Sequence, residues 1–203
     1  MDAAKIRLSP EEAALVLQSE WILTKNRVLQ KVMQLLGVLQ EAQQSHLIEA
    51  GIALPPEVAQ TTAKISKGEN YKGLPYLVLD QPRFFNKENV FAIRTLFWWG
   101  NFFSSTWQLS GEYKMLYAEK IIAAFSLLKE KGFFICINED PWEHHFEAGN
   151  FISLHEVTAD RFETIIRDHT FIKLSRKISL EEWDTAVERL QEIFSVYISI
   201  CRN

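Results

Sequence analysis

Four of the five histidines lie close together in the sequence, at His144, His145, His155 and His169, with Glu147 among them. Imidazole and carboxylate groups are metal ligands, and imidazole also titrates near neutral pH. We therefore take His144, His145, Glu147 and His155 as a candidate metal site. Without a metal, His144 or His145 is a candidate acid/base group. The spacing matches neither HExxH nor another established metal motif, so histidines in ordinary structural surroundings are the competing interpretation.

Two backbone conformations would place these histidines differently. Residues typical of a helix start and stop favour a short helix over 141–148, with His144 and Glu147 on one side. In the alternative, Gly149 turns a hairpin in which His144 faces His155 across the two strands. Both conformations stay open at this point.

A second candidate site is centred on Arg94, which lies in a run of large aromatic residues. A buried cation needs a partner, so we expect Arg94 to stack on Trp107 and to pair with Glu69 or Asp80. A guanidinium in an aromatic pocket can also bind a carboxylate or phosphate, with Glu69 and Tyr71 completing a candidate ligand site. Structural pairing and ligand anchoring are the two interpretations.

No nucleophile or cofactor can be assigned from the sequence. No serine lies in a GxSxG elbow, and Cys136 and Cys201 lie far apart, outside any CxxC motif. We expect both cysteines to be free and buried in a reducing compartment.

The elements that position these residues centre on a predicted hairpin. Residues 91–99 and 102–109 are rich in β-formers and are separated by Gly100 and Asn101, which suit a two-residue turn. This register predicts four facing pairs, namely Trp99 with Phe102, Phe97 with Ser104, Thr95 with Thr106, and Arg94 with Trp107. Because aromatic residues then occupy both faces, the hairpin must be covered on both sides or lie at an oligomer interface.

Apolar periodicity and capping residues predict the remaining elements. We expect one helix from Pro10 to about Ala50, with a break near Gly37, and a loop over 51–75. Further elements are predicted as strands at 76–79, 133–137, 151–154 and 171–174, and helices at 113–131, at 158–168 and after the Ser179 capping box. Together they predict a single α+β domain over 1–203, with a helical region 1–50, the loop 51–75, and a mostly antiparallel sheet with helices in 76–203.

Composition limits the function classes. The chain has 203 residues, with 22 Lys and Arg against 26 Asp and Glu, a net charge of −4, which disfavours nucleic-acid binding. The N-terminus does not resemble a signal peptide and no apolar run could span a membrane, so we expect a soluble, cytoplasmic protein. The leading hypothesis is a non-enzymatic protein that binds itself, as a homo-oligomer such as a homodimer, a partner protein or a small anionic ligand. The alternative is a metal-dependent or acid/base enzyme that uses the histidine cluster.

Overall fold

A computed structural model describes residues 6–51 and 53–202, and within them seven strands form one antiparallel sheet. Its strand order is β1-β2-β3-β4-β7-β5-β6. The strands are β1 (Lys64–Tyr71), β2 (Leu74–Phe85), β3 (Val90–Trp98), β4 (Phe102–Ser110), β5 (Phe134–Cys136), β6 (Phe151–Ser153) and β7 (Phe171–Ser179). The predicted α+β fold with a mostly antiparallel sheet is confirmed.

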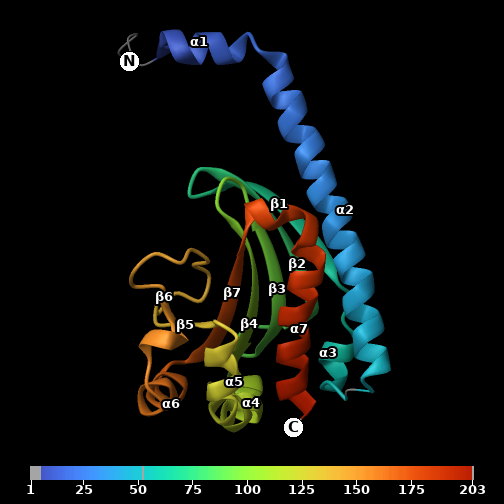
Figure 1. Cartoon of the computed structure of the whole chain (residues 1–203), viewed down its shortest axis with the longest axis vertical. Helices are drawn as coiled ribbons and strands as arrows, with labels where there is room; N and C mark the ends of the chain where they lie inside the picture. The colour runs from blue at the N-terminus through green and yellow to red at the C-terminus, as the bar shows by residue number, and fades with distance from the viewer. Residues whose placement is uncertain (1–5, 52, 203) are drawn as a thin grey trace.

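Helices cover one face and one end of this sheet (Figure 1). The long α2 and the C-terminal α7 pack side by side over that face, while α4, α5 and α6 lie at one end of the strands. The helices are α1 (Pro10–Val16), α2 (Ser19–Glu49), α3 (Pro56–Gln60), α4 (Gly111–Ala123), α5 (Phe125–Glu130), α6 (Ala159–Asp168) and α7 (Ala186–Arg202), with short 3₁₀ helices η2 (Leu154–Glu156) and η3 (Leu180–Thr185).

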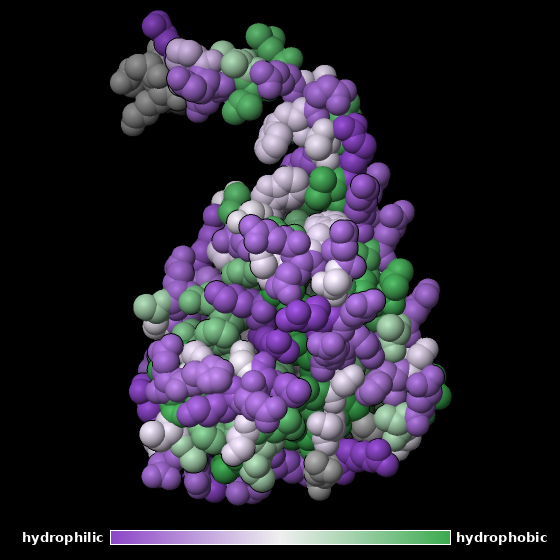
Figure 2. Space-filling view, viewed as in Figure 1, coloured by the Kyte–Doolittle hydropathy of each residue, from purple (hydrophilic) through white to green (hydrophobic). Residues whose placement is uncertain are grey.

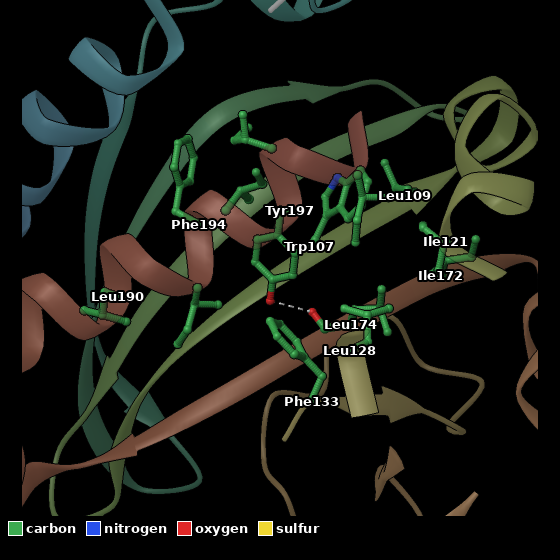
Figure 3. Close-up of a cluster of buried hydrophobic side chains, with 14 of the residues drawn as sticks. Trp107, Leu109, Ile121, Leu128, Phe133, Ile172, Leu174, Leu190, Phe194 and Tyr197 are labelled. Carbon is green, nitrogen blue, oxygen red and sulfur yellow. Dashed lines mark hydrogen bonds between the residues drawn. The ribbon is translucent and has the colours of Figure 1, made fainter. Parts of the chain in front are cut away.

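The main hydrophobic core lies between the sheet and these helices. Trp107 of β4 is 1% exposed, and its ring lies 5.7 Å from that of Tyr197 on α7 (Figure 3). The Tyr197 hydroxyl is fully buried, and it contacts the carbonyl oxygens of Ser105 at 2.8 Å and Leu174 at 3.2 Å. A buried hydroxyl with backbone acceptors avoids the cost of an unsatisfied polar group and ties α7 to β4 and β7.

The opposite face of the sheet is covered by a different kind of structure. We name residues 137–150, which connect β5 to β6, the covering loop. Phe146 of this loop lies 5.1 Å from Phe102 and stacks on Phe151 at 4.7 Å. The chain therefore buries both faces of the β3–β4 hairpin itself, and the hairpin aromatics serve the interior of the domain.

The hairpin is confirmed, but the predicted register is wrong by one residue. Trp98 faces Phe102, Phe97 faces Phe103, Thr95 faces Ser105, and Arg94 faces Thr106. The loop has three residues, because the Asn101 amide donates to the Trp98 carbonyl at 3.1 Å while the Trp99 amide donates to Pro75. Since side chains alternate along a strand, this slip puts Arg94 and Trp107 on opposite faces of the sheet.

The N-terminal helix breaks earlier than expected. The capping box at Ser9 and the stop at Gly51, which has a φ of +59°, are confirmed. The chain leaves the helix at Leu17 and Gln18, whereas Gly37 lies inside α2. Leu36 and Leu39 on either side of Gly37 are fully buried, so packing holds the helix through the glycine.

The loop predicted for 51–75 is wrong over most of its length. This segment contains α3 and the whole of β1, which is a polar strand at the sheet edge. An edge strand needs little apolar alternation because one side of it faces solvent. The strand predicted at 76–79 is also longer, since β2 continues past Pro82 at a bulge between Asp80 and Arg83.

The later elements follow the sequence more closely. The helix predicted for 113–131 is divided at Ala124 into α4 and α5. The strand at 171–174 extends to Ser179, where the predicted capping box begins η3 before α7. The helix predicted for 158–168 is confirmed as α6 with Thr158 as its N-cap.

Candidate functional site

A pocket of about 620 Å³ lies between β1, β2, β3 and the covering loop. We name it the Arg94 pocket. Its size falls in the range of small-molecule sites, about 300–1,000 Å³. It is lined by Lys64, Ser66, Tyr71, Tyr76, Val78, Asp80, Arg83, Phe85, Arg94, Leu96, Trp142 and His144. Charged and aromatic side chains therefore line the same hollow.

The Arg94 guanidinium is held from two sides. Asp80 is its cross-strand neighbour, and the carboxylate accepts from Nε at 2.7 Å and from Nη2 at 3.2 Å. The rings of Phe85 and Trp142 each lie 5.7 Å from the guanidinium carbon. This arrangement fixes a cation against aromatic walls, and Asp80 is the partner, one of the two carboxylates expected from the sequence.

The other residues expected beside Arg94 divide into two groups. Tyr71 lines the Arg94 pocket. Trp107 lies on the opposite face of the sheet, so the predicted stacking on Arg94 is wrong. Glu69 pairs with Lys25 of α2 at 2.5 Å and does not contribute to this pocket.

Tyr71 fastens the covering loop to β1. Its hydroxyl accepts from the backbone amides of His144 at 2.7 Å and His145 at 3.1 Å, and it donates to Glu143 at 2.9 Å. Burial, together with the Glu143 carboxylate, raises the pKa of Tyr71 to about 12. The hydroxyl thus stays protonated at neutral pH, and it can donate one hydrogen bond while it accepts two.

Lys173 fastens the same loop from β7, and sequence reasoning missed it. This side chain is 1% exposed, and its ammonium donates to the carbonyls of Pro141, at 3.0 Å, and Glu143. Burial lowers its pKa to about 8. The sequence feature that could have revealed it is a lysine among the apolar residues that begin β7, Phe171, Ile172 and Leu174, because a charge buried with them needs acceptors.

These contacts explain why residues 141–148 form neither the predicted helix nor the alternative hairpin. They lie in turns, a bend and irregular backbone. A helix would use the Pro141 and Glu143 carbonyls in its own hydrogen bonds, but Lys173 occupies them. Both predicted conformations of this segment are wrong, and the proposed pairing of His144 with His155 across a hairpin is wrong with them.

The histidine cluster is dispersed over separate surroundings. His144 lines the Arg94 pocket, whereas His145 lies next to Glu143 and Glu147 at 3.4 and 3.6 Å. His155 is exposed on η2. Among residues 6–51 and 53–202, no group of three or more His, Cys, Asp and Glu side chains is placed to hold a metal ion.

His144 also lies beside the Arg94 cation. Its Nε2 lies 3.4 Å from Nη1 of Arg94. Burial lowers the pKa of His144 well below its usual value, and the positive charges of Lys173 and Arg94 lower it further. The ring is therefore neutral at pH 7, and its Nε2 can accept a hydrogen bond from the Arg94 guanidinium.

Comparison of the chain with protein-family models, curated proteins and solved structures gives no match. In the described residues, none of the helices is both long enough and apolar enough to cross a membrane.

Cationic side chains are prominent in the lining of the pocket. Lys64, Arg83 and Arg94 face a single lining carboxylate, Asp80, which already pairs with Arg94. Within residues 6–51 and 53–202, three of the five guanidinium N–H groups of Arg94 have a partner. The other two have none there. Cys136 is outside the pocket lining, and burial raises the pKa of its thiol.

Proposed function

We propose that this protein binds a small anionic ligand with a planar or apolar body in the Arg94 pocket. The observation that carries the proposal is the Arg94 guanidinium, which is held by Asp80, lies against the neighbouring rings of Phe85 and Trp142, and lines a cavity with two further cations. A guanidinium fork suits a carboxylate or a phosphate, and the charge excess favours an anion over a neutral ligand.

The walls of the pocket support a ligand with a ring. Tyr71, Tyr76, Phe85 and Trp142 supply aromatic surface on several sides. Gly68 lies directly under the Tyr76 ring, whose nearest atoms are 2.4 Å from the place where a Cβ would stand. Any larger residue at position 68 would therefore displace this wall of the pocket.

Binding without catalysis is the better supported form of this proposal. His144 is an unprotonated base beside the anchor, but the pocket lining includes no serine–histidine or cysteine–histidine pair within hydrogen-bond reach. The metal-dependent alternative gains no support from the placement of His145 and His155.

The proposal is tested with 8-anilinonaphthalene-1-sulfonate, which combines an anion with aromatic rings. We expect saturable binding to the folded protein, measured by fluorescence titration. The Lys64→Gln/Arg83→Gln variant should bind about tenfold more weakly, since exposed charge pairs contribute up to about 1 kcal/mol each.

A matched control removes a lysine from the same strand but the other face. Lys67 lies against α2 rather than the pocket, so Lys67→Gln should leave the affinity unchanged. Competition by benzoate or phenyl phosphate should displace the probe. Equal affinity of the wild type and the double variant would contradict the proposal.

A further inference from the structure

The charges of the Arg94 pocket are gathered at one end of it. Strand pairing places Lys64 of β1, Asp80 of β2 and Arg94 of β3 opposite one another in a single row across three strands. Arg83 lies in the adjacent row, opposite Ala92 of β3. Side chains two residues apart on a strand point to the same face, and the four charged strand residues that line the pocket all come from these two rows.

The rows on the other side of the charged row carry no charge. The first of them holds Ser66, Val78 and Leu96, and the second holds Tyr76. Each step between rows is about 7 Å, because two residues of a strand span that length. Val78 and Leu96 are buried and form an apolar floor, with Tyr76 at the far end. The pocket therefore suits a ligand that is charged at one end only.

The charged end has an excess of positive charge. Asp80 is the carboxylate of the described lining, and its two oxygens accept from Arg94 at 2.7 and 3.2 Å. Within residues 6–51 and 53–202, Lys64 and Arg83 have no acidic partner, and Arg83 Nε donates to the Thr62 carbonyl at 2.9 Å. Three cations against one carboxylate leave two positive charges for a ligand to neutralise.

These three cations are close enough to contact one bound group. Lys64 and Arg94 are two strands apart, about 10 Å at the backbone, and Arg83 lies on the strand between them, one row away. Lysine has a flexible four-carbon stem, and arginine presents a fork of N–H donors. The three charged ends can therefore reach the oxygens of a single group from three directions.

We propose that the ligand of the Arg94 pocket is a phosphate monoester of a flat, uncharged ring compound. The phosphate contacts the three cations, and the ring lies over Val78 and Leu96 and points toward Tyr76. A phosphate monoester carries about 1.5–2 negative charges on one group at neutral pH, whereas a carboxylate, sulfate or sulfonate carries one. A ring with carboxylates at opposite ends would place its second charge over the apolar floor, where it has no partner.

This inference rests on the proposed function and narrows it, so the experiment separates the two. The first measurement compares phenyl phosphate with phenyl sulfate by isothermal titration calorimetry at pH 8. The two probes share the ring and the tetrahedral anion and differ by one negative charge. Phenyl phosphate should bind about tenfold more tightly, which is the effect expected for two exposed charge pairs. At pH 5 this preference should fall to about twofold, because the second pKa of a phosphate monoester is about 6.

A pair of variants assigns the preference to the cations of the pocket. Lys64→Gln/Arg83→Gln should reduce the preference for phenyl phosphate from about tenfold to about twofold. Lys67→Gln is the matched control, because Lys67 lies on the same strand as Lys64 but lines a different hollow beside α2. This control should keep the full preference.

A further control concerns apolar surface outside the pocket, to which aromatic probes also bind. Figure 2 shows hydrophobic residues on α1, where Leu15 is 52% exposed, and Leu17 directly after this helix is 86% exposed. Leu15→Ser/Leu17→Ser removes apolar surface there without touching the core or the pocket lining. The affinity of this variant for phenyl phosphate should equal that of the wild type.

The second measurement tests where the ring lies. 4-Biphenylyl phosphate is longer than phenyl phosphate by one ring, which should extend over the apolar floor to Tyr76. It should bind about three- to tenfold more tightly than phenyl phosphate, as expected for one added aromatic contact. Tyr76→Ser should reduce this gain to less than about twofold.

The outcomes distinguish failure of this inference from failure of the proposed function. Equal affinity for phenyl phosphate and phenyl sulfate at pH 8, or a preference that persists in Lys64→Gln/Arg83→Gln, would overturn the phosphate assignment and leave anion binding in place. A second ring that brings no gain, or a gain that survives Tyr76→Ser, would overturn the position of the ring. No binding of phenyl phosphate, phenyl sulfate or benzoate would overturn the proposed function and this inference together.

Discussion

The Tyr71 hydroxyl offers the sharpest test of how the covering loop is held. It contacts three groups of the loop, namely the amides of His144 and His145 and the carboxylate of Glu143. Tyr71→Phe removes one oxygen and keeps the ring, which lies 5.0 Å from that of Trp98. The substitution therefore removes these three hydrogen bonds while leaving the aromatic packing in place.

The expected magnitude follows from the two amides that lose their acceptor. A net hydrogen bond contributes about 0.5–1.5 kcal/mol, and a buried donor left without a partner costs about 1–3 kcal/mol. Because Tyr71 and His144 are only half-buried, water can reach part of the site and the lower range applies. We expect the free energy of unfolding to fall by about 1–2 kcal/mol.

The assay combines urea unfolding with amide hydrogen exchange. A loss of about 1.4 kcal/mol corresponds to a tenfold change in the opening equilibrium, so the His144 and His145 amides should exchange about tenfold faster. Tyr76→Phe is the control, because the Tyr76 hydroxyl makes no hydrogen bond to residues 6–51 or 53–202 and its ring lines the same pocket.

Two results would refute this account of the Tyr71 hydroxyl. If Tyr71→Phe and Tyr76→Phe unfold at the same urea concentration and the two amides exchange as in the wild type, then the hydroxyl does not hold the loop. Faster exchange of the sheet amides without faster exchange at His144 and His145 would also refute it, because the substitution would then act on the fold without releasing the loop.

Three further predictions concern His144, Trp107 and Gly37. Folding lowers the pKa of His144, so the unfolded state binds its proton first and the free energy of unfolding decreases as the pH falls below 6.5. Urea titrations at pH 6 and pH 5 should show a decrease in the wild type that exceeds that of His144→Gln by up to about 1.4 kcal/mol per pH unit. Trp107→Ala should reduce the free energy of unfolding by about 3–5 kcal/mol, because it empties a fully buried site, and a loss below 1 kcal/mol would contradict its place in the core. Gly37→Ala should raise the midpoint of thermal unfolding, by a stabilisation of about 0.5–1 kcal/mol, since an added Cβ meets no atom within 4 Å, and a lower midpoint would show that α2 needs the glycine.

Much of the fold could be predicted from the sequence, because its determinants lie within a few residues of one another. The capping boxes at Ser9 and Ser179 fix helix starts through contacts three residues apart. Gly100 fixes the hairpin reversal through a local positive φ of +71°. Apolar periodicity is equally local, and it located α6 and α7.

The register and the edge of the sheet were decided by pairing between distant strands. Both turn geometries are compatible with Gly100 and Asn101, and the backbone contact between Trp99 and Pro75 selects the longer one. The one additional loop residue shifts the register by one position, and this shift puts Arg94 and Trp107 on opposite faces of the sheet. Strand β1 has almost no apolar pattern, so only its hydrogen bonds to β2 make it a strand.

The candidate site shows the same division between local and distant causes. Charge balance alone indicated that Arg94 needs a carboxylate, and Asp80 was among the candidates. The covering loop, in contrast, takes its shape from Tyr71 and Lys173, which lie about 70 residues before it and 30 residues after it. Local capping residues favour a helix at 141–148, but the buried Lys173 ammonium and the half-buried Tyr71 hydroxyl bind its backbone groups, and an isolated two-turn helix is only marginally stable. The sequence by itself therefore determined the positions of most long helices, the hairpin and the need for a partner at Arg94, because these depend on neighbouring residues. The tertiary structure decided the register, the edge strand and which side chains share the pocket, because these depend on contacts between distant segments.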